Sequence, residues 1–130
     1  MKLKGNPVVV LKMALKILDK GRHWGKGKFN YKDEKRVTRY CPMGAVFKAR
    51  QNLGVSESRS WTAECEALTY TIPHARKIRN GIASYNDARK RTWPQVEEWM
   101  KNAIRFAEES IETQETFAER EYREDRMIDR

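Results

Sequence analysis

The sequence has no long apolar run. Its most apolar stretch, Val8 to Leu11, is followed directly by Lys12, whereas a helix that crosses a membrane needs about 20 consecutive apolar residues. No membrane span is therefore expected. Residues 1–4 begin with charges, as a secretory signal peptide does, but lysines interrupt the next apolar segment and no small-residue cleavage site follows. These absences predict a cytoplasmic protein.

Cysteine and histidine are scarce, with two of each. Cys41 and Cys65 lie far apart within predicted helices, and neither they nor His23 and His74 show the paired spacing of a zinc site. We therefore expect reduced thiols, no metal and no cofactor. Because Cys41 precedes a helix start, the helix dipole could lower its pKa, and a nucleophile pair with a histidine stays open. No catalytic motif supports that pair, so a non-enzymatic protein is favoured.

Charge is abundant but unevenly divided. The net charge is +9, and residues 1–91 hold 21 lysine and arginine residues against seven acidic ones, a net of +14. Residues 92–130 hold six against 11, a net of −5. A basic surface attracts nucleic acid or acidic proteins, whereas an acidic segment can screen or mimic such a partner. The charge pattern therefore predicts an anionic macromolecule as the partner.

Cap residues and apolar spacing predict a mainly α fold. Asn6 before Pro7, Cys41 before Pro42, Ser60, and Thr92 with Gln95 each mark a helix start. Gly21, Gly54 and Pro73 are the expected stops. The four predicted helices are residues 7–20, 42–53, 61–72 and a long helix from residue 93.

Between the first two helices, residues 28–31 and 37–40 alternate weakly around a charged turn, which predicts a short β-hairpin. The last helix, if continuous over residues 93–128, would reach about 54 Å. We therefore expect a helical domain with a basic surface over residues 1–107 and a charged helical extension over residues 108–130. The apolar positions of the extension leave a homodimer through this helix open.

Several short motifs occur in a recognisable order. A leucine-rich first helix precedes Trp24-Gly25-Lys26-Gly27, and a helix start follows at Cys41-Pro42-Met43-Gly44-Ala45. Tyr85-Asn86-Asp87 comes next, then Arg91-Thr92 with Val96. In this order the chain resembles a family of small uncharacterised bacterial and phage proteins, domain of unknown function 6197, over roughly residues 8–107. The resemblance implies a small helical domain from a bacterium or phage, and no activity.

Two segments are candidate binding sites. Residues 22–32 interleave cations with aromatic rings in a glycine-containing loop, a composition that suits phosphates and stacked bases. We favour rings that anchor the loop to the core, with lysines left for binding. Tyr85-Asn86-Asp87 could orient a polar ligand near two arginines, although a local turn is favoured. The candidate residues are Arg22, His23, Trp24, Lys26, Lys28, Tyr31, Arg36, Arg39, Tyr85, Asn86, Asp87, Arg89 and Arg91.

The leading hypothesis is a non-enzymatic accessory protein that binds nucleic acid or a host protein through its basic body, in a bacterial cell or a phage-infected host. A second hypothesis is a small enzyme or ligand-binding protein with a pocket near Trp24, Cys41 and Asp87. It requires those three segments to converge. A third is a self-assembling structural protein that uses the last helix.

Overall fold

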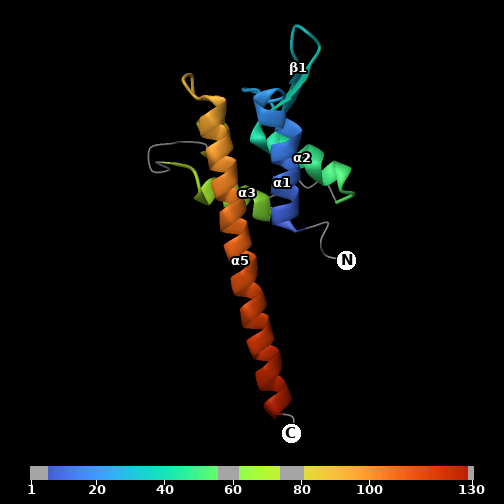
Figure 1. Ribbon diagram of the computed structural model, residues 1–130, viewed down its shortest axis with the longest axis vertical. Helices are drawn as coiled ribbons and strands as arrows, with labels where there is room; N and C mark the ends of the chain where they lie inside the picture. Colours follow the sequence, from blue (N-terminus) through green and yellow to red (C-terminus); the bar gives the residue numbers. More distant parts are fainter. Residues whose placement is uncertain (1–5, 56–61, 74–80, 129–130) are drawn as a thin grey trace.

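The computed structural model is mainly helical, as predicted (Figure 1). It describes residues 6–55, 62–73 and 81–128, with side chains through residue 110. The elements in chain order are α1 (Pro7–Leu18), the 3₁₀ turn η1 (Asp19–Gly21), β1 (Asn30–Lys32), β2 (Thr38–Tyr40), α2 (Pro42–Asn52), α3 (Ala63–Tyr70), α4 (Gly81–Asp87) and α5 (Trp93–Ile128). The additional helix relative to the four predicted is the short α4.

Helix α1 begins as predicted and ends two residues early. The Asn6 side chain accepts a hydrogen bond from the Val8 amide at 2.8 Å. At the other end Asp19 and Lys20 adopt left-handed backbone angles, so the chain turns before it reaches Gly21. Gly21 itself has φ +92°, and the ring of Trp93 occupies the place where a Cβ atom would stand. Only glycine permits this close packing of the turn against α5.

The predicted hairpin is present, with its first strand shifted by two residues. Strands β1 and β2 pair antiparallel, with Tyr31 opposite Arg39. Asp33 organises the connecting turn, since its Oδ1 atom accepts hydrogen bonds from the amides of Lys35 and Val37. Arg36 takes a left-handed conformation within the turn. The hairpin extends beyond the helical body at one end of the molecule (Figure 1).

Helix α2 starts directly after β2, and its first turn lies against the loop before β1. Cys41 caps the helix, with its Sγ atom accepting from the Gly44 amide at 3.4 Å. The Cys41 amide donates to the Phe29 carbonyl oxygen at 3.3 Å. A Cβ atom on Gly44 would overlap that same carbonyl group. The glycine therefore fixes how closely the loop approaches α2.

Helix α3 begins at a different cap from the one predicted. Thr62 accepts a hydrogen bond from the Cys65 amide at 3.3 Å and caps the helix. The predicted cap Ser60 and the neighbouring Trp61 lie outside the described residues. Residues 74–80, for which the sequence also suggests one or two helical turns, lie outside them as well. Cys65, Leu68 and Ile72 follow one another at helical spacings of three and four, and all three are buried.

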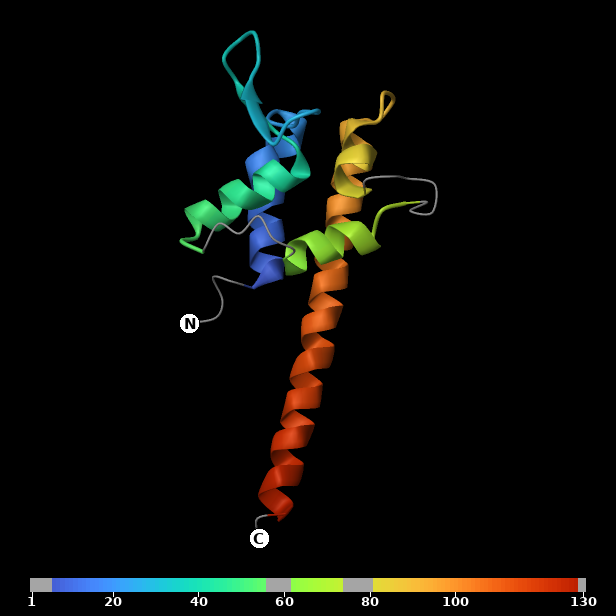
Figure 2. The same cartoon turned by 180° about the vertical axis from the view of Figure 1, so that it is seen from behind.

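The core lies where α1 and α5 run side by side, with α2 packed on α1 and α3 on both (Figure 2). Trp99 is fully buried at its centre and donates its indole N–H to the Leu68 carbonyl at 2.8 Å. A nearly buried ion pair, with 2.7 Å between Arg50 Nη1 and Glu64 Oε1, joins α2 to α3. Cys41 and Cys65 are buried and unpaired, in line with the predicted reduced thiols.

Helix α5 begins at the predicted capping residues, where the Thr92 amide donates to Gln95 Oε1 at 3.0 Å. Val96, Met100, Ala103 and Ala107 follow one another at spacings of three and four, and they form its buried face. Beyond the body the helix continues alone toward the C-terminus (Figures 1 and 2). Pairing of this segment with a second copy stays a prediction. Among the described residues no helix is both long enough and apolar enough to span a membrane.

The contact between Gly44 and the Phe29 carbonyl predicts that Gly44→Ala destabilises the protein, although glycine-to-alanine changes in helices usually stabilise. Glycine to alanine inside a helix ordinarily raises stability by about 0.5–1 kcal/mol. Here we expect Gly44→Ala to lower the free energy of unfolding by about 1–3 kcal/mol, because the new methyl group displaces the Phe29 backbone. Urea unfolding would measure it, with Gln51→Ala at an exposed position of α2 as the control. A stabilised Gly44→Ala protein would contradict the contact.

Candidate nucleic-acid interface

The loop of residues 22–29 is held against the end of α4 by a buried amide. Asn86 is fully buried. Its Oδ1 atom accepts from the Trp24 indole N–H at 2.7 Å, and its Nδ2 atom donates to the Gly25 carbonyl and to Asp87 Oδ1, each at 3.0 Å. One side chain thus joins two segments that lie about 60 positions apart in the sequence.

Two further contacts complete the junction. Asp87 Oδ1 also accepts from the Gly27 amide at 2.9 Å. The Lys26 ammonium donates to the Ala88 carbonyl at 2.8 Å and lies 5.5 Å from the centroid of the Trp24 ring. Lys26 therefore closes the junction instead of standing free in solvent. The favoured local turn at Tyr85-Asn86-Asp87 is wrong: these are the last residues of α4, and Asn86 bonds mainly across to the distant loop.

Aromatic packing supports the same junction. Trp24 lies 6.1 Å from Trp93 by ring centroids and packs on the core, as expected for an anchoring ring. The Tyr31 ring covers Gly25, leaving no room there for a side chain. Phe29 differs from the other rings of the loop, since half of its surface is exposed. It is the ring of this loop that remains open to a ligand.

Two of the candidate arginines bond to carbonyl groups of the protein. The Arg91 guanidinium stacks on the Tyr85 ring at 3.5 Å and its Nε atom donates to the Tyr85 carbonyl at 2.7 Å. Arg39 donates through Nε to Asp33 Oδ2 at 2.7 Å and through Nη1 to the Trp24 carbonyl at 2.9 Å. His23 is also engaged, with Nδ1 2.8 Å from the Thr38 carbonyl oxygen.

The remaining cations are exposed. Within the described part of the chain, no side-chain hydrogen bond or ion pair is formed by Lys28, Lys32, Lys35, Arg36, Arg89 or Lys90. Arg22 makes only a long, exposed contact to Asp19, at 3.8 Å. Three of the exposed lysines, Lys32, Lys35 and Lys90, were not among the sequence candidates. Lys32 ends β1, within the candidate segment of residues 22–32, whereas Lys35 and Lys90 lie in turns.

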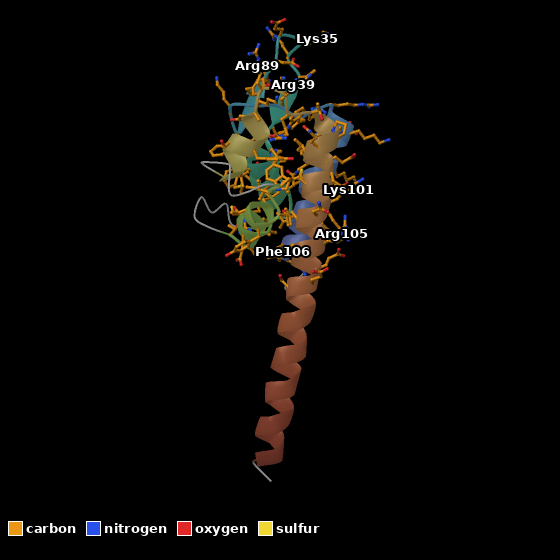
Figure 3. All side chains as sticks on the ribbon, turned by 90° about the vertical axis from the view of Figure 1, so that its left-hand side faces the viewer. Lys35, Arg39, Arg89, Lys101, Arg105 and Phe106 are labelled. Carbon is orange, nitrogen blue, oxygen red and sulfur yellow. The ribbon has the colours of Figure 1, made fainter. Side chains whose placement is uncertain are left out.

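These cations gather at one end of the molecule. Figure 3 shows Lys35 and Arg89 at the end formed by the hairpin and the α4–α5 connection, with Lys101 and Arg105 farther along α5. We call residues 20–40 and 85–91 the basic end. It holds 11 lysine and arginine residues against three acidic ones, a net charge of +8. One acid, Asp33, is already paired with Arg39.

The second hypothesis required the Trp24 loop, the α2 start and the α4 end to converge, and they do. A cavity of about 430 Å³ lies among them, and its described lining residues are Gly27, Lys28, Phe29, Cys41, Ala83 and Asp87. His23 is not among these residues, and His74 lies outside the described residues. In the described ranges no three histidine, cysteine or acidic residues cluster as metal ligands.

Cys41 does not have the properties expected of a nucleophile. Burial raises the pKa of its thiol above the ordinary value, against the smaller effect of the Gly44 and Met43 amides. The expectation that the helix dipole would lower this pKa is therefore wrong, because desolvation of the thiolate outweighs the dipole. Cys41 is a neutral part of the cavity wall.

The Asn86 junction can be tested by truncation. Asn86→Ala leaves the Trp24 indole N–H and the Gly25 carbonyl without this partner, so we expect the free energy of unfolding to fall by about 1–3 kcal/mol. Amide hydrogen exchange should accelerate across residues 22–28. Asn102→Ala, whose side chain bonds only Arg105 at 2.8 Å, is the control. Unchanged exchange in the loop would show that the loop is held by other contacts.

The hairpin turn should respond to pH. The hydrogen bond from Arg39, followed by that from the Val37 amide, lowers the pKa of Asp33 below its usual range. The stabilisation is therefore complete above the ordinary aspartate pKa and is lost as the pH falls through the lowered value. NMR titration of the Asp33 carboxyl should show a higher pKa in Arg39→Gln, with Arg36→Gln as a control for charge. Equal shifts in both variants would contradict a direct pair.

Among known proteins, the chain matches one family. No curated protein and no solved structure matches the chain significantly. The match to the family of unknown function DUF6197 spans residues 4–106 and so covers the α-helical body, the hairpin and the whole basic end. The chain therefore belongs to that family.

Proposed function

We propose that the protein binds nucleic acid through the basic end. The observation that carries the proposal is that exposed, unpaired cations from two distant segments are held together on one surface. Lys28, Lys32, Lys35 and Arg36 come from the hairpin region, and Arg89 and Lys90 come from the α4–α5 connection. Phosphate contacts by such cations release counterions and supply most of the affinity for nucleic acid.

The hydrogen bonds beneath this surface support the proposal. Lys26, Arg39 and Arg91 are committed to carbonyl groups and fix the backbone of both segments. The backbone that carries the outer cations is therefore already fixed by hydrogen bonds, and it does not have to become ordered when a ligand binds. Preorganised cations lose less conformational entropy on binding, which favours affinity.

The acidic segment does not cancel this field within one molecule. Helix α5 starts beside the basic end, where Trp93 contacts Gly21 and Trp24. Its acid-rich sequence begins at Glu108, about 22 Å along the axis at 1.5 Å per residue. Charges in water are largely screened beyond about 8 Å at physiological ionic strength. The basic end therefore keeps its attraction for an external polyanion.

The experiment is a binding titration with labelled single- and double-stranded DNA and RNA, over about 50 to 200 mM salt. We expect affinity to fall steeply with salt. Replacing Lys28, Lys32, Lys35 and Arg36 together with glutamine should weaken binding and reduce the slope of log K against log salt by about 0.7–0.9 for each lost phosphate contact. These cations bond nothing in the described chain, so folding should be unaffected.

The matched control replaces Lys12, Lys48, Lys101 and Arg105, which lie on the helical body, with glutamine. It removes the same charge away from the basic end. Equal weakening in both variants would mean that net charge alone binds the polymer, which would overturn the assigned surface. No binding of any nucleic acid at low salt would reject the proposal and favour an acidic protein as the partner.

A further inference from the structure

The cavity beside Phe29 borders the basic end and resembles a small-ligand site in its size and lining. Its volume of about 430 Å³ falls within the range of about 300–1,000 Å³ that is usual for such sites. Phe29, Ala83 and the neutral Cys41 thiol make its described wall largely apolar. Asp87 and Lys28 are the charged residues of that wall. We call this cavity the Asp87 pocket.

Asp87 is the one acidic residue of the described pocket lining. Its Oδ1 atom is already engaged by the Gly27 amide and by Asn86 Nδ2. Its Oδ2 atom accepts no hydrogen bond from the described residues, although the residue is exposed. The carboxylate is held in place through one oxygen while the other remains available. A ligand with an N–H group directed at Oδ2 would complete the acceptor.

The positive charge around Asp87 determines whether the donor group of the ligand is cationic or neutral. A carboxylate alone would attract an amine or guanidinium. Here the carboxylate lies within a surface of net charge +8 that repels cations and attracts anions. The charge favours a ligand that is anionic overall yet presents neutral N–H donors to Asp87. A nucleobase attached to a phosphate has this combination.

The exposed ring of Phe29 offers a stacking surface for such a base. Phe29 lines the pocket with half of its surface exposed, and its ring is held edge-on to Phe47 at 5.3 Å between centroids. A base can stack on such a ring regardless of its sequence. Lys28, in the same wall, is available to a phosphate of the same nucleotide.

We infer that the Asp87 pocket binds a guanine base of a single strand held on the basic end. Guanine is the base whose Watson–Crick edge carries two adjacent N–H donors, and both can point at the free Oδ2 oxygen. Adenine and cytosine place an unprotonated ring nitrogen beside their amino group, and the carboxylate repels this acceptor. Uracil and thymine place carbonyl oxygens on both sides of their single N–H group, and the carboxylate repels these oxygens. This inference rests on the proposed function, and it names the base that the site selects.

The test compares an oligothymidine strand with the same strand carrying one central guanine. A hydrogen bond to a charged group predicts binding about tenfold tighter for the guanine strand. Asp87→Asn keeps an oxygen for the Gly27 and Asn86 donors but replaces the free oxygen with an NH₂ group. This variant should lose the guanine preference and keep salt-dependent binding of the oligothymidine strand. Thermal unfolding checks that it folds.

Two control variants separate the pocket from general effects. Asp19→Asn makes the same charge change at the edge of the basic end and should preserve the guanine preference. Phe29→Leu should weaken the guanine strand about tenfold through lost stacking. Tyr70→Leu changes the other strongly exposed large apolar side chain of the described chain and should have no effect.

The outcomes separate this inference from the proposed function. Equal affinity for both strands, or a preference that survives in Asp87→Asn, would overturn the pocket assignment while leaving nucleic-acid binding intact. If guanosine monophosphate binds in an Asp87-dependent manner but no strand does, the strand is wrong and the pocket serves a free nucleotide. A guanine preference abolished by Asp87→Asn, but not by Asp19→Asn, would support the inference.

Discussion

The arrangement of the basic end depends on the buried amide of Asn86. A fully buried amide lowers the free energy only when its donors and acceptor are satisfied, and Asn86 satisfies them with the Trp24 indole, the Gly25 carbonyl and Asp87. Because two of these partners belong to the loop before β1, the amide fixes that loop against α4. The hairpin and the α4–α5 connection are neighbours as a consequence.

This junction divides the cations into two groups with different physical roles. Lys26, Arg39 and Arg91 donate to carbonyl groups that no regular helix or strand satisfies. The outer cations of the basic end, such as Lys35 and Arg89, form no side-chain hydrogen bond or ion pair with the described residues. Sequence composition does not distinguish the two groups, whereas their hydrogen bonds lead us to expect different results from replacing them. Removing an inner cation disturbs the backbone, and removing an outer one changes mainly the surface charge.

Local hydrogen bonds explain which parts of the fold follow from sequence. Asn6 and Thr92 act on amides or side chains within three residues, so their patterns mark α1 and α5 correctly. The C-terminal end of α1 and the role of Asn86 depend on contacts with distant segments, which no local pattern contains. The convergence of the Trp24 loop, Cys41 and Asp87 could be posed as a hypothesis, but the exposure of Phe29 and the neutrality of Cys41 required the packed structure.

The acidic, projecting part of α5 gives the molecule an electric dipole along this helix. Residues 111–128 hold six acidic residues against three arginines, and they span about 27 Å at 1.5 Å per residue. Positive and negative charge are thus separated along one axis. Near a polyanion, a torque would rotate the molecule so that the hairpin faces the polymer and the helix points outward.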